Sequence, residues 1–121
     1  MRFQDMDRSK KPIRLTRSAR MALPKTISDW VEEIKRWSAQ KGFDFDWEQA
    51  PTFLMLIVTE ASEAMQAWRD DDKAKFAEEL ADLVIRAFHM AGQLGIDLEA
   101  EVARKMAINW RRPYRHGHKR A

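Results

Sequence analysis

The sequence predicts an all-α domain built from four helices. Apolar residues recur at helical spacing over four stretches of the chain, whereas no alternating β-branched run of the kind that forms strands is present. The 121 residues include only four Gly and four Pro, so few positions interrupt these stretches. A chain of this length suits one domain. We expect the helices at 28–41, 51–69, 73–94 and 97–111.

The ends of the expected helices carry recognisable capping residues. Ser28 or Asp29 can cap the first helix, and Gly42 suits its carboxyl end. Pro51 lies in the first turn of the second helix, where its missing N–H costs nothing. Asp97 can cap the fourth helix.

The net charge of +3 is distributed unevenly along the chain. Residues 1–25 carry eight Lys and Arg against two acids, while 26–110 carries nine basic and seventeen acidic residues. We therefore expect a basic, disordered N-terminal arm over 1–25, the domain over 26–112 and a basic tail over 113–121. An acidic body with basic ends argues against a nucleic-acid partner.

Two further properties of the composition bound the location. No apolar run approaches the ~20 residues that a membrane span requires, and no signal peptide is visible. Without cysteine the chain cannot form disulfides or use thiolate chemistry. Both properties fit a cytoplasmic protein without a membrane partner.

Two pairs of acids are the strongest chemical feature of the sequence. Glu60 and Glu63 lie three residues apart on the second helix, and Glu79 and Asp82 have the same spacing on the third, so each pair shares a helix face. Both pairs border the apolar stripe of their helix. Carboxylates at a core boundary must be protonated, paired or bound to a metal. One pair alone is typical of a solvated face, but two on consecutive helices predict a site for Mg²⁺ or Mn²⁺.

Three other features have two readings each. The aromatic loop 43–50 is either a hydrophobic plug or a base-stacking wall with Trp47 as its main ring. Lys105 and Asn109, four apart beside the apolar stripe, are either phosphate and ribose or base contacts, or a snorkelling lysine with an ordinary helix-end Asn. His89 is expected to be a surface or boundary histidine rather than a ligand.

Taken together, these motifs resemble a known family over residues 28–115. It is the family of MazG-like, all-α nucleoside triphosphate pyrophosphohydrolases, and the motifs that carry the resemblance are Glu60-x-x-Glu63, Glu79-x-x-Asp82 and Lys105-x-x-x-Asn109-x-x-Arg112. The resemblance implies a four-helix fold, a homodimer or homotetramer, and Mg²⁺-dependent hydrolysis of a (deoxy)nucleoside triphosphate to monophosphate and pyrophosphate. Nucleotide-pool housecleaning is the role that it suggests.

The resemblance also assigns roles by position. It gives the metal to Glu60, Glu63, Glu79 and Asp82. The chemistry of a metal-bound water, rather than the resemblance, offers Glu60 or Glu63 as the catalytic base. We expect substrate contacts from Trp47, Arg86, Lys105, Asn109 and Arg112.

The chain departs from the family pattern at two positions. Thr59 stands where some members carry a further Glu, which leaves the base unassigned between Glu60 and Glu63. Arg86 stands where the dCTP-cleaving branch has an aromatic residue, so the preferred base stays open.

Two other functions stay open on the residues alone. The chain could act on another polyphosphate nucleotide. It could also be a non-catalytic helical oligomerisation module in which the acids pair with Arg86, Arg104 and Lys105.

Overall fold

A computed structural model describes residues 15–115 and 120. Those residues form helices and connecting turns, with no strand among them. The all-α prediction is confirmed, and the four long helices begin and end within one residue of the predicted positions. Their bounds are Ile27–Lys41 for α2, Ala50–Arg69 for α3, Lys73–Leu94 for α4 and Leu98–Arg111 for α5, preceded by the short α1, Arg17–Met21.

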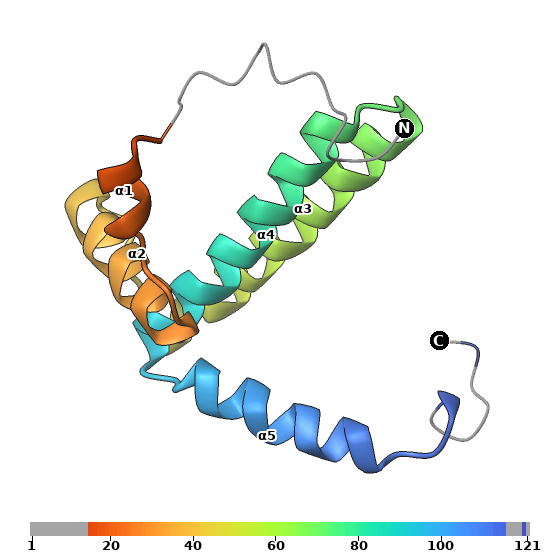
Figure 1. Cartoon of the computed structure of the whole chain (residues 1–121). Coiled ribbons are helices and arrows are strands. Elements are labelled where there is room, and N and C mark those ends of the chain that lie inside the picture. Colours follow the sequence, from red (N-terminus) through yellow and green to blue (C-terminus); the bar gives the residue numbers. More distant parts are fainter. Residues whose placement is uncertain (1–14, 116–119, 121) are drawn as a thin grey trace.

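The body of the molecule is the hairpin of α3 and α4, which lie side by side along their whole length (Figure 1). Small buried residues, including Ala64 and Ala67, let the helix backbones approach closely. A three-residue turn joins the two helices. In it Asp71 adopts a positive φ of 52°, and the Asp72 carboxylate accepts from Lys75 N–H at 3.0 Å, which caps α4.

Helix α2 packs on the carboxyl-terminal half of α4. A Cβ at Gly92 would lie 3.3 Å from Val31 Cγ1, so the missing side chain is what permits this close approach. The predicted cap of α2 at Ser28 or Asp29 was wrong. Thr26 is the cap, because it has the extended backbone that a cap needs and exchanges hydrogen bonds with Asp29 three residues later.

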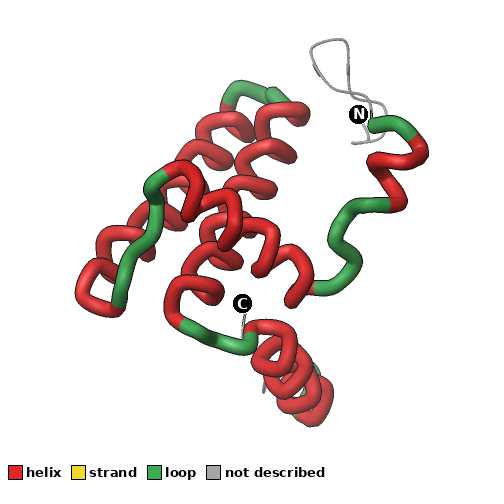
Figure 2. The backbone as a smooth tube through the Cα atoms, turned by 90° about the vertical axis from the view of Figure 1, so that its left-hand side faces the viewer, coloured by secondary structure: helices red, strands yellow, loops and turns green. Residues whose placement is uncertain are grey.

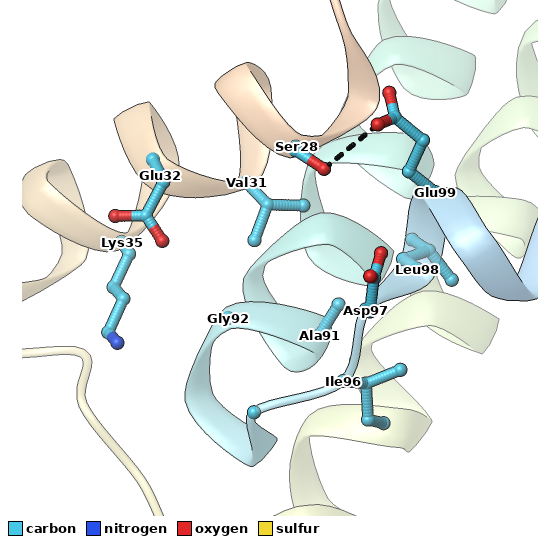
Figure 3. A pocket seen from close by; sticks show the side chains of 11 residues that line it. Ser28, Val31, Glu32, Lys35, Ala91, Gly92, Ile96, Asp97, Leu98 and Glu99 are labelled. Carbon is cyan, nitrogen blue, oxygen red and sulfur yellow. Dashed lines mark hydrogen bonds between the residues drawn. The ribbon is translucent and has the colours of Figure 1, made fainter.

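Helix α5 is set apart from this body. It packs mainly on α2 and projects away from α3 and α4 in both views (Figure 1 and Figure 2). A cavity of about 280 Å³ lies where it meets α2 and the end of α4, and there Ser28 Oγ donates to Glu99 Oε2 at 3.2 Å (Figure 3). No residue of Leu98–Arg111 is buried. The four predicted helices are present, but the fourth does not lie alongside the others.

Several apolar side chains that the helical pattern places in a core are exposed. They include Trp30 and Trp37 on α2, Trp68 on α3 and Leu80 on α4. Periodicity identifies an apolar face but not what covers it, and among the described residues these side chains are covered only in part, as where Trp37 stacks on Phe43. The hairpin therefore carries apolar surface on its outside as well as between its helices.

The described part of the N-terminal arm contains a short helix. Where the sequence predicts a disordered arm, residues 17–21 form α1, which Thr16 caps and which buries no side chain. Residues 1–14 of that arm, and 116–119 and 121 of the tail, lie outside the described residues. Among the described helices, none combines the length and apolar character that crossing a bilayer requires.

Candidate metal centre

Three of the four predicted metal ligands meet between α3 and α4. One carboxylate oxygen from each of Glu60, Glu79 and Asp82 lies within 4.8 Å of the others. Glu60 is 7% exposed, Glu79 is 2% exposed and Asp82 is half-buried. We call these three residues with Glu63 the acid cluster.

The helical repeat explains why these acids face inward. Glu60 lies one turn before Ala64 and two turns before Ala67, and all three are buried on the face of α3 that meets α4. Because α4 runs back along α3, its residues Glu79 and Asp82 pass this face at the level of Glu60. The sequence therefore folds the acids into the helix interface rather than onto an open surface.

One oxygen of Glu79 has no hydrogen-bond partner in the described part of the chain. Lys75 Nζ lies 3.0 Å from Glu79 Oε1, whereas Oε2 is buried without a hydrogen-bond donor among the described residues. A buried carboxylate oxygen without a donor is costly, so it indicates a position that a cation fills. Oxygen donors from carboxylates at this separation fit a hard divalent ion such as Mg²⁺ or Mn²⁺.

The charges of the cluster act on one another. The neighbouring Glu79 carboxylate is the main cause that raises the pKa of Glu63, which is itself exposed at the edge of the cluster. Burial, followed by the Glu60 charge, raises the pKa of Asp82. The hydrogen bond from Lys75 lowers the pKa of Glu79 and keeps it ionised. Like charges held this close favour binding of a cation.

Two basic residues of α4 reach the cluster. Arg86 Nε donates to Glu60 Oε1 at 2.7 Å, so this predicted substrate contact lies at the acid cluster itself. Lys75 was missed from the sequence, although its position four residues before Glu79 on one helix was a readable signal. In the oligomerisation hypothesis Arg86 pairs with the acids, and it does so here within one chain. Arg104 instead pairs with Glu101.

The remaining predicted substrate residues lie elsewhere. Lys105, Asn109 and Arg112 are on or just after α5, which projects away from the acid cluster (Figure 1). Trp47 is 72% exposed in a short 3-10 helix, Trp47–Gln49, at the start of α3. The helical rise puts the start of α3 about 15 Å along the axis from Glu60. Within one chain these side chains do not join the acids.

The aromatic loop before α3 contains a buried ring and exposed rings. Phe45 is buried and stacks on Phe53 with ring centroids 3.9 Å apart, as a hydrophobic plug would. Trp47 is exposed, and its role in stacking on a base stays a prediction. The prediction for His89 was wrong, because this histidine is 5% exposed and packs edge-on against Phe45 and Phe53. Burial lowers the pKa of His89, which favours the neutral ring.

Comparison with known proteins identifies the family of this chain. The MazG-like family matches residues 52–121, a range that includes both acid pairs and α5. This chain belongs to the MazG-like family. The resemblance to this family that the three motifs indicated is thus confirmed.

Three curated relatives share about 30% sequence identity with this chain. The chain is 31% identical to human dCTP pyrophosphatase 1 over 98 residues, which covers 68% of this chain and 58% of the human protein. The rat and bovine proteins of the same name are 30% and 31% identical over the same shares. The chain thus spans a little over half the length of the curated relatives it matches. No solved structure matches it significantly.

Proposed function

We propose that this chain hydrolyses a (deoxy)nucleoside triphosphate to nucleoside monophosphate and pyrophosphate with the help of Mg²⁺. The observation that carries the proposal is the buried convergence of Glu60, Glu79 and Asp82, with one Glu79 oxygen left without a donor among residues 15–115. Membership of the MazG-like family supports the reaction class. Housecleaning of the nucleotide pool in the cytoplasm is the role such an activity would serve.

The acid cluster would hold the metal through Glu60, Glu79 and Asp82. When bound, Mg²⁺ supplies charge neutralisation at the phosphates and increases the acidity of water. Glu63 is exposed at the edge of the cluster, where water can reach it, so it is the better-placed base. It would take the proton of the water that attacks the α-phosphorus, and pyrophosphate would leave.

The substrate is proposed from the relatives. They are named dCTP pyrophosphatases, so dCTP is the first triphosphate to test. Arg86 lies against Glu60 rather than in an aromatic subsite, so a broader or different base preference is part of the proposal. Another polyphosphate nucleotide is the alternative substrate.

Assembly would complete the site. Helix α5 exposes Val102, Met106 and Trp110, the last of them 83% exposed, and the α3–α4 hairpin exposes Trp68 and Leu80. Apolar faces of this extent are typical of surfaces that other copies cover. We propose a homodimer or homotetramer in which α5 of one copy reaches the acid cluster of another. Its Lys105, Asn109 and Arg112 would then contact phosphate and sugar.

A triphosphate panel with pyrophosphate detection tests the proposal directly. We expect Mg²⁺-dependent release of pyrophosphate from at least one deoxynucleoside triphosphate, and loss of that release in excess chelator. Turnover that persists in excess chelator would refute the metal role.

A thermal melt in Mg²⁺ separates the enzyme from a non-catalytic module. A real metal site is stabilised by mass action, whereas an acid cluster satisfied by Arg86 and Lys75 alone gains little. Absence of both turnover and Mg²⁺ stabilisation would favour the oligomerisation module.

A further inference from the structure

Four residues of α4 form one row along its inner face. Lys75, Glu79, Asp82 and Arg86 follow one another at intervals of four, three and four residues, which keeps them on a single helix face. The row therefore has a cation at each end and two acids between them. Helix α3 adds Glu60 and Glu63 opposite the acids.

Both cations contact the most buried carboxylates of the cluster. Lys75 Nζ lies 3.0 Å from Glu79 Oε1 and 3.7 Å from Glu78 Oε2, and Arg86 Nε lies 2.7 Å from Glu60 Oε1. Each cation occupies one oxygen of a predicted metal ligand, whereas Glu79 Oε2 stays buried without a donor among the described residues. The pairing is thus incomplete, and an additional cation still has an oxygen to bind.

Among the described residues, neither cation has a polar partner beyond these three carboxylates. The Lys75 side chain is half exposed, and its two ion pairs both lie on its own helix. The terminal nitrogens of Arg86 donate no hydrogen bond within the part of the chain that the structure describes. Both side chains can therefore leave their carboxylates without breaking another hydrogen bond or ion pair among the described residues.

The carboxylates of the acid cluster carry more negative charge than the two cations neutralise. Four ionised carboxylates carry −4, and the two cations bring the set to −2, which one divalent ion neutralises. Without the charges of Lys75 and Arg86, the same carboxylates would attract a divalent ion more strongly. When no divalent ion is bound, they would also repel one another more strongly.

We propose that Lys75 and Arg86 are tethered counter-ions, which hold the acid cluster together without metal and lower its affinity for a divalent ion by competing for Glu79 and Glu60. The inference rests on the proposed metal site. It assigns these two residues a positioning role that weakens metal binding, opposite to the effect of a ligand. Reversible binding of the metal, together with its nucleotide, would follow from such competition.

Mn²⁺ titration followed by electron paramagnetic resonance of the free ion tests this role without any turnover. Lys75→Gln and Arg86→Gln should each tighten Mn²⁺ binding about three- to tenfold, because each removes a positive charge that repels the ion and competes with it for a carboxylate. The charge-retaining variants Lys75→Arg and Arg86→Lys should bind Mn²⁺ with the wild-type affinity to within about twofold.

Matched controls exist on the same and on another helix. Lys73→Gln removes a lysine of α4 that pairs with Asp71, and Arg36→Gln removes an arginine of α2 that pairs with Glu33. Neither pair touches the acid cluster, so both variants should keep the wild-type Mn²⁺ affinity.

The possible results separate two failures. Wild-type protein that binds no Mn²⁺ overturns the proposed function and this inference with it. Wild-type binding that Lys75→Gln leaves unchanged or weakens, with a wild-type helical circular dichroism spectrum, overturns the counter-ion role alone. Because Lys75 is half exposed, its variant decides the question even if Arg86→Gln fails to fold.

Discussion

The α3–α4 hairpin and α5 differ in how far their side chains are buried and paired within one chain. The hairpin buries Glu60 and Glu79 between its own helices and provides Lys75 and Arg86 to pair with them. Helix α5 buries nothing and exposes an apolar stripe. In the proposed function, one chain therefore supplies the acids of the proposed metal site by itself, whereas the proposed substrate contacts of α5 need a further surface.

The largest expected effect comes from the loss of one buried carboxylate in the hairpin. Glu79→Gln removes a charged ligand while keeping the shape of the side chain, so turnover should fall by about 100-fold or more. Mg²⁺ should no longer raise the melting temperature, and the helical circular dichroism should stay near that of wild type. Steady-state kinetics and a thermal melt check both statements.

The adjacent residue offers a close control. Glu78 lies next to Glu79 on α4 but is exposed and outside the cluster of three close oxygens. Glu78→Gln should keep both turnover and the Mg²⁺ stabilisation. Equal losses in the two variants would mean that overall charge on α4, rather than ligation by Glu79, is what matters.

The second prediction concerns α5. Met106→Asp puts a charge in the middle of the exposed stripe, so it should weaken self-association by about 100-fold or more if another copy covers that stripe. Light scattering after size exclusion measures the oligomeric state, and turnover should fall in parallel. The control Ala100→Asp puts the same charge on another side of α5 and should change neither.

Mixing experiments sharpen the same point. Chains with Glu79→Gln and chains with Lys105→Ala should each be nearly inactive alone. A mixture should recover part of the activity if α5 serves the acid cluster of another copy. No recovery in a mixture that is shown to exchange subunits would place both residues in the same chain's site.

The third prediction concerns the loop ahead of the hairpin. Trp47→Ala should raise KM about tenfold, the size expected for one lost base-stacking contact, and leave kcat almost unchanged. Trp47 is exposed, so the helical content should not change. The matched change Trp37→Ala removes another exposed tryptophan, on α2, and an equal rise in KM there would argue against stacking by Trp47.

The sequence predicted what depends on local spacing. The inward direction of Glu60, Glu79 and Asp82 follows from helical periodicity, because each acid keeps the phase of its apolar neighbours. The placement of α5 did not follow, since a short turn and an amphipathic stripe do not say which surface the stripe meets. The burial of His89 was missed for the same reason: Phe45, which packs on it, comes from a loop 44 residues earlier in the chain.

The smallest expected effect separates metal binding from stability within the hairpin. Burial and the Glu60 charge raise the pKa of Asp82, so the folded chain binds that proton more tightly than the unfolded chain does. This group therefore adds stability as pH falls through the range above the ordinary Asp pKa, and at neutral pH its charge is a cost. Asp82→Asn should raise the melting temperature in chelator by about 2–4 °C.

The same variant should lose the stabilisation that Mg²⁺ gives, because one of the three close oxygens is no longer charged. It should also flatten the dependence of the melting temperature on pH between neutral and mildly acidic conditions. Differential scanning calorimetry with and without Mg²⁺ measures all three effects. A lower melting temperature in chelator would mean that the Asp82 carboxylate stabilises the hairpin without metal, so the acids would be structural rather than held together for a cation.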